Sequence, residues 1–154
     1  MFPPRLRRHL ALAAAAVGTV VLAGCSTTVM DLKNGDCLNL PAELDLTTSA
    51  EFSVGSVEKV ECSKDHQAEV IAVLDLETPE DKDFPGVEVL WDRAAKQCME
   101  RFEEYVGQPL EESSLEVLPL LPSEESWEQA GDREGLCVAY LTTGKANTTF
   151  KNYR

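Results

Sequence analysis

The chain has 154 residues, an apolar fraction of 44% and a net charge of −13. The apolar fraction is ordinary for a globular protein, so the chain need not be disordered. The negative charge disfavours nucleic acid, whose phosphates attract Lys and Arg, and argues against a polybasic patch on anionic lipid. We therefore expect an acidic protein with one hydrophobic core and no nucleic-acid partner.

Residues 1–24 have the parts of an export signal in the usual order. A short basic segment, Met1–His9, precedes an apolar run from Leu10 to Val21. The run is too short to span a bilayer, which needs about 20 apolar residues, and has the length of a signal-peptide core. An uncleaved N-terminal anchor is the alternative. Adjacent arginines would allow a twin-arginine route, but the residues after them fit the general secretory route better. Without the signal, 27 acidic and 11 basic residues remain, a net charge of −16.

The segment Leu22-Ala23-Gly24-Cys25 resembles the lipobox of bacterial lipoproteins. A diacylglyceryl donor can alkylate the Cys25 thiolate, and cleavage then makes Cys25 the new N-terminus. Two acyl chains hold a protein firmly to a membrane. The sequence therefore predicts an extracytoplasmic protein, attached through Cys25 to the outer face of the cell membrane, with residues 25–34 as a lipidated tether.

Four cysteines remain after Cys25, and an even number in an exported domain indicates disulfides. Three pairings are possible. We favour Cys37–Cys62 and Cys98–Cys137, because each pair joins neighbouring segments of the chain. Zinc is the alternative, but the chain has no C-x-x-C spacing and only one histidine after the signal. We expect no metal and no cofactor.

The first part of the expected domain, residues 35–141, contains a loop and two strands. Pro41–Ser53 mix Thr, Ser and acids, as loops do. Val57–Cys62 alternate apolar and charged residues, and Ala68–Leu76 are β-branched and apolar. These patterns predict a hairpin whose second strand is central in the sheet.

One long helix is predicted over Val87–Val106, followed by the helix-ending residues Gly107 and Pro109. Its apolar residues recur at spacings of three and four and define one face. They are Trp91, Ala94, Ala95, Cys98, Phe102 and Tyr105.

The remaining elements are shorter. Leu115–Leu121 predict a strand at an edge or bulge, because Pro119 cannot donate a ladder hydrogen bond. A short helical turn carries Trp127, and Leu136–Leu141 predict a last strand. Residues 142–154 are polar, and we expect a frayed tail. The expected fold is α+β, a small antiparallel sheet with one long packed helix and two disulfides.

Three motifs together resemble the septum-formation domain of actinobacterial envelope proteins. They are Gly35-Asp36-Cys37, Val60-Glu61-Cys62-x-x-x-His66-x-x-Glu69-Val70 and Trp127-x-x-x-Gly131-Asp132-Arg133-x-x-x-Cys137. The resemblance covers about residues 35–141 and implies an exported or membrane-tethered protein connected with cell division, without an established reaction. Cys98 also fits the pattern of the family, which supports its pairing with Cys137.

The polar and aromatic members of these motifs are candidate binding residues. They are His66, Glu69, Trp127, Asp132 and Arg133. For Trp127 the alternative is a place in the core, and Asp132 and Arg133 could instead cap the short helix or pair with each other.

Catalysis has weaker support. Ser63, Asp65 and His66 invite a hydrolase hypothesis, but neighbours in a turn rarely point at one another, and no nucleophile-elbow motif is present. We expect His66 to hydrogen-bond locally. A glycosidase-like pair would need two acids across a sugar-binding cleft, whereas many surface acids usually form only a solvated face. A calcium site in the acidic loop of residues 77–84 would need the EF-hand order of acids and glycine, which the chain lacks.

The sequence thus favours a non-enzymatic surface lipoprotein that binds another protein of the cell envelope, and the family resemblance implies a connection with cell division. The first alternative is a lipoprotein that binds a small ligand or a cell-wall fragment in a groove beside Trp127 and the acidic loop. The second is a hydrolase that uses His66.

Overall fold

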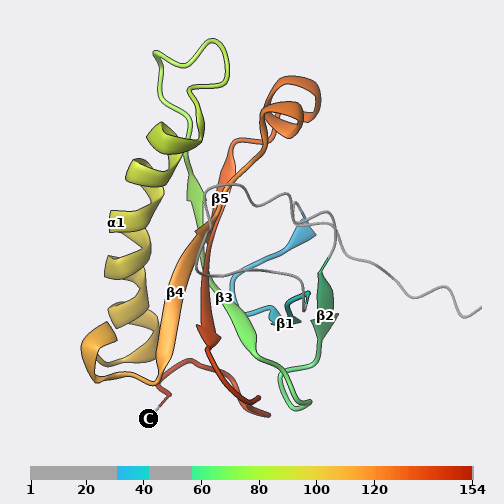
Figure 1. The fold of residues 1–154 in the computed structure, drawn as a ribbon, viewed down its shortest axis with the longest axis vertical. Coiled ribbons are helices and arrows are strands. Elements are labelled where there is room, and N and C mark those ends of the chain that lie inside the picture. The colour runs from blue at the N-terminus through green and yellow to red at the C-terminus, as the bar shows by residue number, and fades with distance from the viewer. Residues whose placement is uncertain (1–30, 42–56, 154) are drawn as a thin grey trace, which may run out of the picture.

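A computed structural model describes residues 31–41 and 57–153. Cys25, the expected signal and most of the expected loop at 41–53 lie outside these residues. The described chain forms five strands and one long helix. The strands make one sheet, and the helix, α1, covers one face of it (Figure 1). The strands are β1 (Cys37–Asn39), β2 (Glu58–Val60), β3 (Ala68–Asp75), β4 (Leu115–Leu120) and β5 (Glu134–Leu141).

The sheet is antiparallel, with the strand order β2-β1-β3-β5-β4. β3 is central, as predicted, and β4 with Pro119 lies at an edge. The predicted hairpin of β2 with β3 is wrong, because β1 lies between them. Cys37 in β1 and Cys62 just after β2 are joined by a disulfide, which holds these two short strands together.

The helix α1 (Val87–Val106) has the predicted bounds. It ends at Gly107, whose left-handed φ of 83° suits glycine and whose N–H donates to the Glu103 carbonyl. The fully buried face of the helix is rotated slightly about the helix axis relative to the predicted apolar face. The buried residues are Leu90, Ala94, Cys98, Phe102 and Val106, while Trp91, Ala95 and Tyr105 are half-buried.

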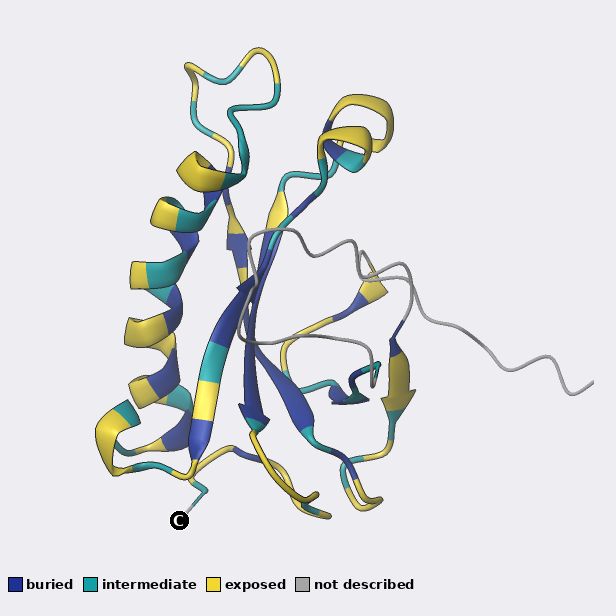
Figure 2. Cartoon of the chain, viewed as in Figure 1, coloured by how far each residue is buried: buried dark blue, intermediate teal, exposed yellow. Residues whose placement is uncertain are grey.

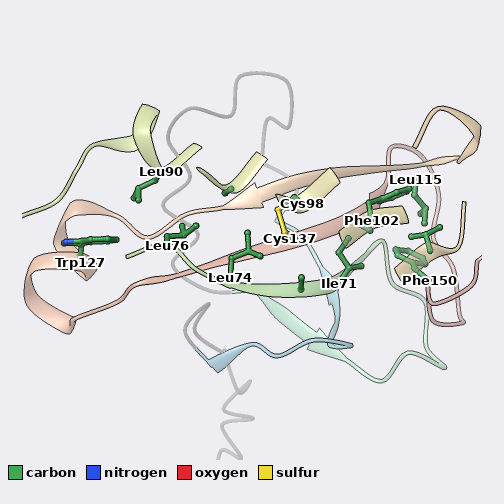
Figure 3. Close-up of a cluster of buried hydrophobic side chains, with 14 residues drawn as sticks. Ile71, Leu74, Leu76, Leu90, Cys98, Phe102, Leu115, Trp127, Cys137 and Phe150 are labelled. Atoms are coloured by element: carbon green, nitrogen blue, oxygen red, sulfur yellow. A yellow bond between two sulfur atoms is a disulfide. The ribbon is translucent and has the colours of Figure 1, made fainter. Parts of the chain in front are cut away.

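An apolar cluster fills the space between α1 and the sheet, with the Cys98–Cys137 disulfide at its middle and Trp127 and Phe150 at its ends (Figure 3). A second apolar cluster lies on the other face of β5 and β4, since alternate residues of a strand point to opposite faces. The buried side of α1 faces the sheet and its exposed side faces outward (Figure 2). Both predicted disulfides are present, and the α+β fold is confirmed.

The boundaries of the folded part differ from the predicted ones. Leu32 is 3% exposed and belongs to the second apolar cluster, so the packed chain begins inside the expected tether. At the other end, Ala146 exchanges two backbone hydrogen bonds with His66, and Phe150 is completely buried. The prediction of a frayed tail after residue 141 is therefore wrong.

Phe150→Ala should lower the free energy of unfolding by about 3 kcal/mol, because it opens a cavity between the sheet and α1. Denaturation in urea would measure this change. Lys151→Ala, at an exposed neighbouring position, is the matched control and should change stability by less than about 0.5 kcal/mol. Equal, small effects at both positions would show that the segment is not packed in solution.

Candidate functional site

The Glu69 carboxylate is the most buried acidic group in the described chain, with 1% exposure. It accepts hydrogen bonds from the Tyr105 hydroxyl at 2.6 Å, the Thr149 hydroxyl at 2.7 Å and the Phe150 N–H. These donors come from α1 and from the C-terminal segment, so Glu69 fastens both to the sheet. Burial and the hydrogen bond to Glu69 raise the pKa of Tyr105 to about 12, which keeps its hydroxyl protonated as a donor.

A ligand role for this group is disfavoured by its neighbours. The sulfurs of Cys37 and Cys62 lie close to the Glu69 carboxylate, a grouping that could bind a metal if the cysteines were free thiols. They form a disulfide, so neither is available as a thiolate ligand. Glu69 was predicted as a binding residue, and the structure places it in the interior as a structural acceptor.

His66 is also buried, with 0% exposure. Its Nδ1 lies 2.8 Å from the Lys64 carbonyl and must donate there, and its ring packs against Phe150 with 5.3 Å between centroids. The predicted local hydrogen bond is therefore confirmed. Ser63 and Asp65 are exposed and form no hydrogen bond with His66, so the three side chains are not arranged as a hydrolase triad.

Trp127 lies in the core, as the structural alternative predicted. It is 1% exposed, with its ring in a T-shaped contact with Phe84 and the Arg133 guanidinium 4.0 Å from the ring centroid. Trp127 is therefore not available to stack on a ligand in a groove.

The side chains of Asp132 and Arg133 form no ion pair with each other, although the Arg133 guanidinium donates to the Asp132 backbone carbonyl at 3.1 Å. Arg133 donates to the Trp127 carbonyl at 2.6 Å and thus caps the short helix η3 (Ser126–Ala130), one of the two predicted roles. The Asp132 carboxylate instead accepts from the Glu134 N–H at 3.2 Å. Both residues have structural partners within their own loop.

The acidic loop before α1 is closed by an ion pair. Asp81 binds Arg93 of α1 through both carboxylate oxygens and also accepts hydrogen bonds from the Thr78 N–H and hydroxyl. Arg93 in turn donates to the Leu76 carbonyl at 3.0 Å. Glu77 pairs with Arg133, so two acids that a calcium ion would need are already neutralised by arginine.

The hydrogen bond from Arg93 lowers the pKa of Asp81 to about 2. Because its pKa is lower in the folded than in the unfolded chain, Asp81 stabilises the fold above about pH 4, and this contribution is lost as the pH falls toward 2. Asp81→Asn should therefore reduce stability at pH 6 and have little effect at pH 2. Urea denaturation at both pH values measures this; a difference between the two proteins that does not change with pH would contradict it.

A pocket of about 470 Å³ lies elsewhere, beside β3 and the second half of α1. Apolar residues of β3 and charged residues of other segments line it. Its lining residues are Asn34, Ile71, Ala72, Val73, Arg101, Glu104, Tyr105 and Lys151. None of the five predicted binding residues is among them.

Residues 34–152 match the family described as septum formation. The chain belongs to the septum formation family. No curated protein and no solved structure matches the chain. The resemblance seen in the sequence is thus confirmed, and the match extends beyond residue 141 through the packed C-terminal segment.

Within this septum formation domain, the motif residues that carried the resemblance build the fold. The cysteines form the disulfides, while Glu69 and His66 hold the C-terminal segment and Arg133 caps η3. The pocket escaped the sequence analysis because its lining comes from four separate segments with no common motif. Its local sign is Val73, an exposed apolar residue between the buried Ala72 and Leu74 of β3.

Proposed function

We propose that this septum formation protein is a non-enzymatic lipoprotein, anchored by Cys25 outside the cell membrane, whose domain binds another envelope protein at the division site. The lipobox supports the anchor, and the family supports the connection with the septum.

One observation carries the binding role, namely the composition of the pocket beside β3. Its described lining contains no Ser, Thr, Cys or His, and the hydroxyl of its one tyrosine is already bonded to Glu69. His66 and Glu69, two groups that could act as a base elsewhere in the described chain, are buried in structural roles. An apolar floor with a charged rim suits recognition of a partner.

The proposed anchor limits where that partner lies. Six residues lie between Cys25 and the packed Leu32, and the seven steps from one Cα to the next reach at most about 25 Å when fully extended. An anchored domain would therefore stay close to the membrane surface, so we expect the partner to have a membrane-proximal extracytoplasmic part.

Lipid attachment is tested by growing cells with an alkyne-labelled fatty acid and separating the membranes. The wild-type protein should carry the label and sediment with the membranes, and Cys25→Ala should do neither. An unlabelled wild-type protein would overturn the anchor.

Partner binding is tested by cross-linking intact cells with a hydrophilic amine-reactive reagent. The protein should recover a discrete partner well above the level seen with an unrelated lipoprotein of similar abundance. Recovery of the same neighbours at the same frequency would overturn the proposed binding role.

A further inference from the structure

The side of β3 that faces β1 is open over the second half of the strand. β1 pairs with β3 only at Ala68 and Glu69, and Val70 exchanges two further backbone hydrogen bonds with the turn before β1. A bulge lies between Val70 and Ala72, where this pairing stops. Beyond it, no described strand pairs with that side of β3 from Ala72 to Asp75.

The backbone direction shows which groups are left open. The Leu76 N–H donates toward β5, to the Arg133 carbonyl at 2.9 Å. Backbone groups of successive residues in an antiparallel strand point alternately to its two neighbours. The N–H and C=O groups of Val73 and Asp75 therefore point away from β5, to the open side, where an added strand could bond to them.

The two outer edges of the sheet are protected in ways that this stretch is not. β4 carries Pro119, and β2 has three residues, of which Glu58 and Lys59 are exposed. Proline, charge and short length are common protections against strand addition. The open stretch has no proline or lysine, and Val73 is 38% exposed. Its one charged residue is Asp75 at its far end, whose carboxylate accepts a hydrogen bond from the Glu77 N–H at 3.1 Å.

The pocket lies directly along this open stretch, because Ile71, Ala72 and Val73 form part of its lining. Three charged side chains line the pocket, namely Arg101, Lys151 and Glu104. Arg101 pairs with Glu104 at 2.9 Å, whereas Lys151 forms no ion pair with any carboxylate in the described part of the chain. The lining therefore carries one excess positive charge in a protein whose net charge is −13.

We infer that the partner binds by adding an extended segment as a strand beside Ala72–Asp75, with an acidic side chain of that segment near Lys151. This inference rests on the proposed function, since it names the surface that the envelope partner uses. The open stretch is about 13 Å long, at roughly 3.3 Å per residue, and accepts about four partner residues. Backbone hydrogen bonds supply affinity, and the pocket and Lys151 supply specificity.

The test uses the full-length protein in its own cells, with photo-reactive p-benzoylphenylalanine in place of the exposed pocket residue Asn34. The same group in place of Val89, exposed at the start of α1, is the positional control. After irradiation, mass spectrometry maps the attached segment. Position 34 should attach to an Asp- or Glu-containing segment of another protein.

Two substitution pairs then test the mode of binding. Val73→Pro removes the outward N–H without removing a bond to β5, and should lower the yield from position 34 by about tenfold or more. Val73→Thr keeps that N–H and should stay within about twofold. Lys151→Glu should also lower the yield, and Lys82→Glu, at an exposed site outside the pocket, should not.

Attachment of position 34 only to this chain or to a small molecule would overturn the inference. So would unchanged yields with both Val73→Pro and Lys151→Glu in proteins that keep their disulfides and melting temperature. A protein partner attached at position 89 but not at 34 would reject this surface and leave the proposed function standing. Attachment to no protein from either position would count against both.

Discussion

Glu69→Ala should lower the free energy of unfolding by about 3–5 kcal/mol. The substitution leaves the Tyr105 hydroxyl, the Thr149 hydroxyl and the Phe150 N–H without their acceptor inside the protein. Each buried donor that loses its partner costs about 1–3 kcal/mol, and entering water would recover part of that. Urea denaturation of the soluble protein from Ser26 onward measures the loss.

Two further variants distinguish the contribution of the Glu69 carboxylate to stability from that of a single donor. Glu69→Gln keeps the shape but brings an NH₂ group against one of the donors, so we expect a smaller loss than for alanine. Tyr105→Phe removes one donor and should cost about 1 kcal/mol. In Glu69→Ala, trypsin should cleave faster after Lys145 and Lys151, because the C-terminal segment is released. A stability loss below about 1 kcal/mol with unchanged cleavage would contradict the role assigned to Glu69.

Replacing both Cys98 and Cys137 with alanine should cost about 4 kcal/mol. The disulfide closes a loop with a sequence separation of 39, and the chain-entropy relation gives that value for its effect on the unfolded state. It also joins α1 to the central region of the sheet, where both residues are at most 1% exposed.

The Cys37–Cys62 bridge is the matched comparison, because its separation of 25 predicts about 3.5 kcal/mol. Thermal and urea denaturation of the two double-alanine variants measure both losses. A Cys98–Cys137 variant as stable as the wild type would contradict the account of the core.

The features that depend on short-range sequence patterns could be predicted from the sequence. The helix could be predicted because its apolar residues repeat at helical spacing over twenty residues and Gly107 ends it. The edge position of β4 followed from Pro119, and the cysteine spacing favoured the disulfide pairs that are present.

Contacts between segments that are far apart in the chain could not be predicted from such local patterns. β1 has three residues, too few for a periodic signal, so its insertion beside β3 was missed. Residues 142–153 are mostly polar, and the partners that fix them, Glu69 and His66, lie about 80 residues earlier. Only the fold showed that Phe150 is an anchor and that Glu69 is an acceptor.

The structure also changes which residues are worth mutating for function. The motif residues hold the domain together, so their substitution would report on stability. Val73 and Lys151 are exposed or at the pocket, and their substitution tests recognition with less effect on folding. A functional screen should therefore begin at the open side of β3.

The central claim is that an anchored domain is held at the division site by a partner. It is tested most directly by the septum-to-sidewall fluorescence ratio of a fusion joined by a linker after Arg154, beside Cys25→Ala and an unrelated lipoprotein. The account predicts a wild-type ratio clearly above that of the unrelated lipoprotein, and loss of membrane retention in Cys25→Ala. A wild-type ratio equal to that of the unrelated lipoprotein would contradict it.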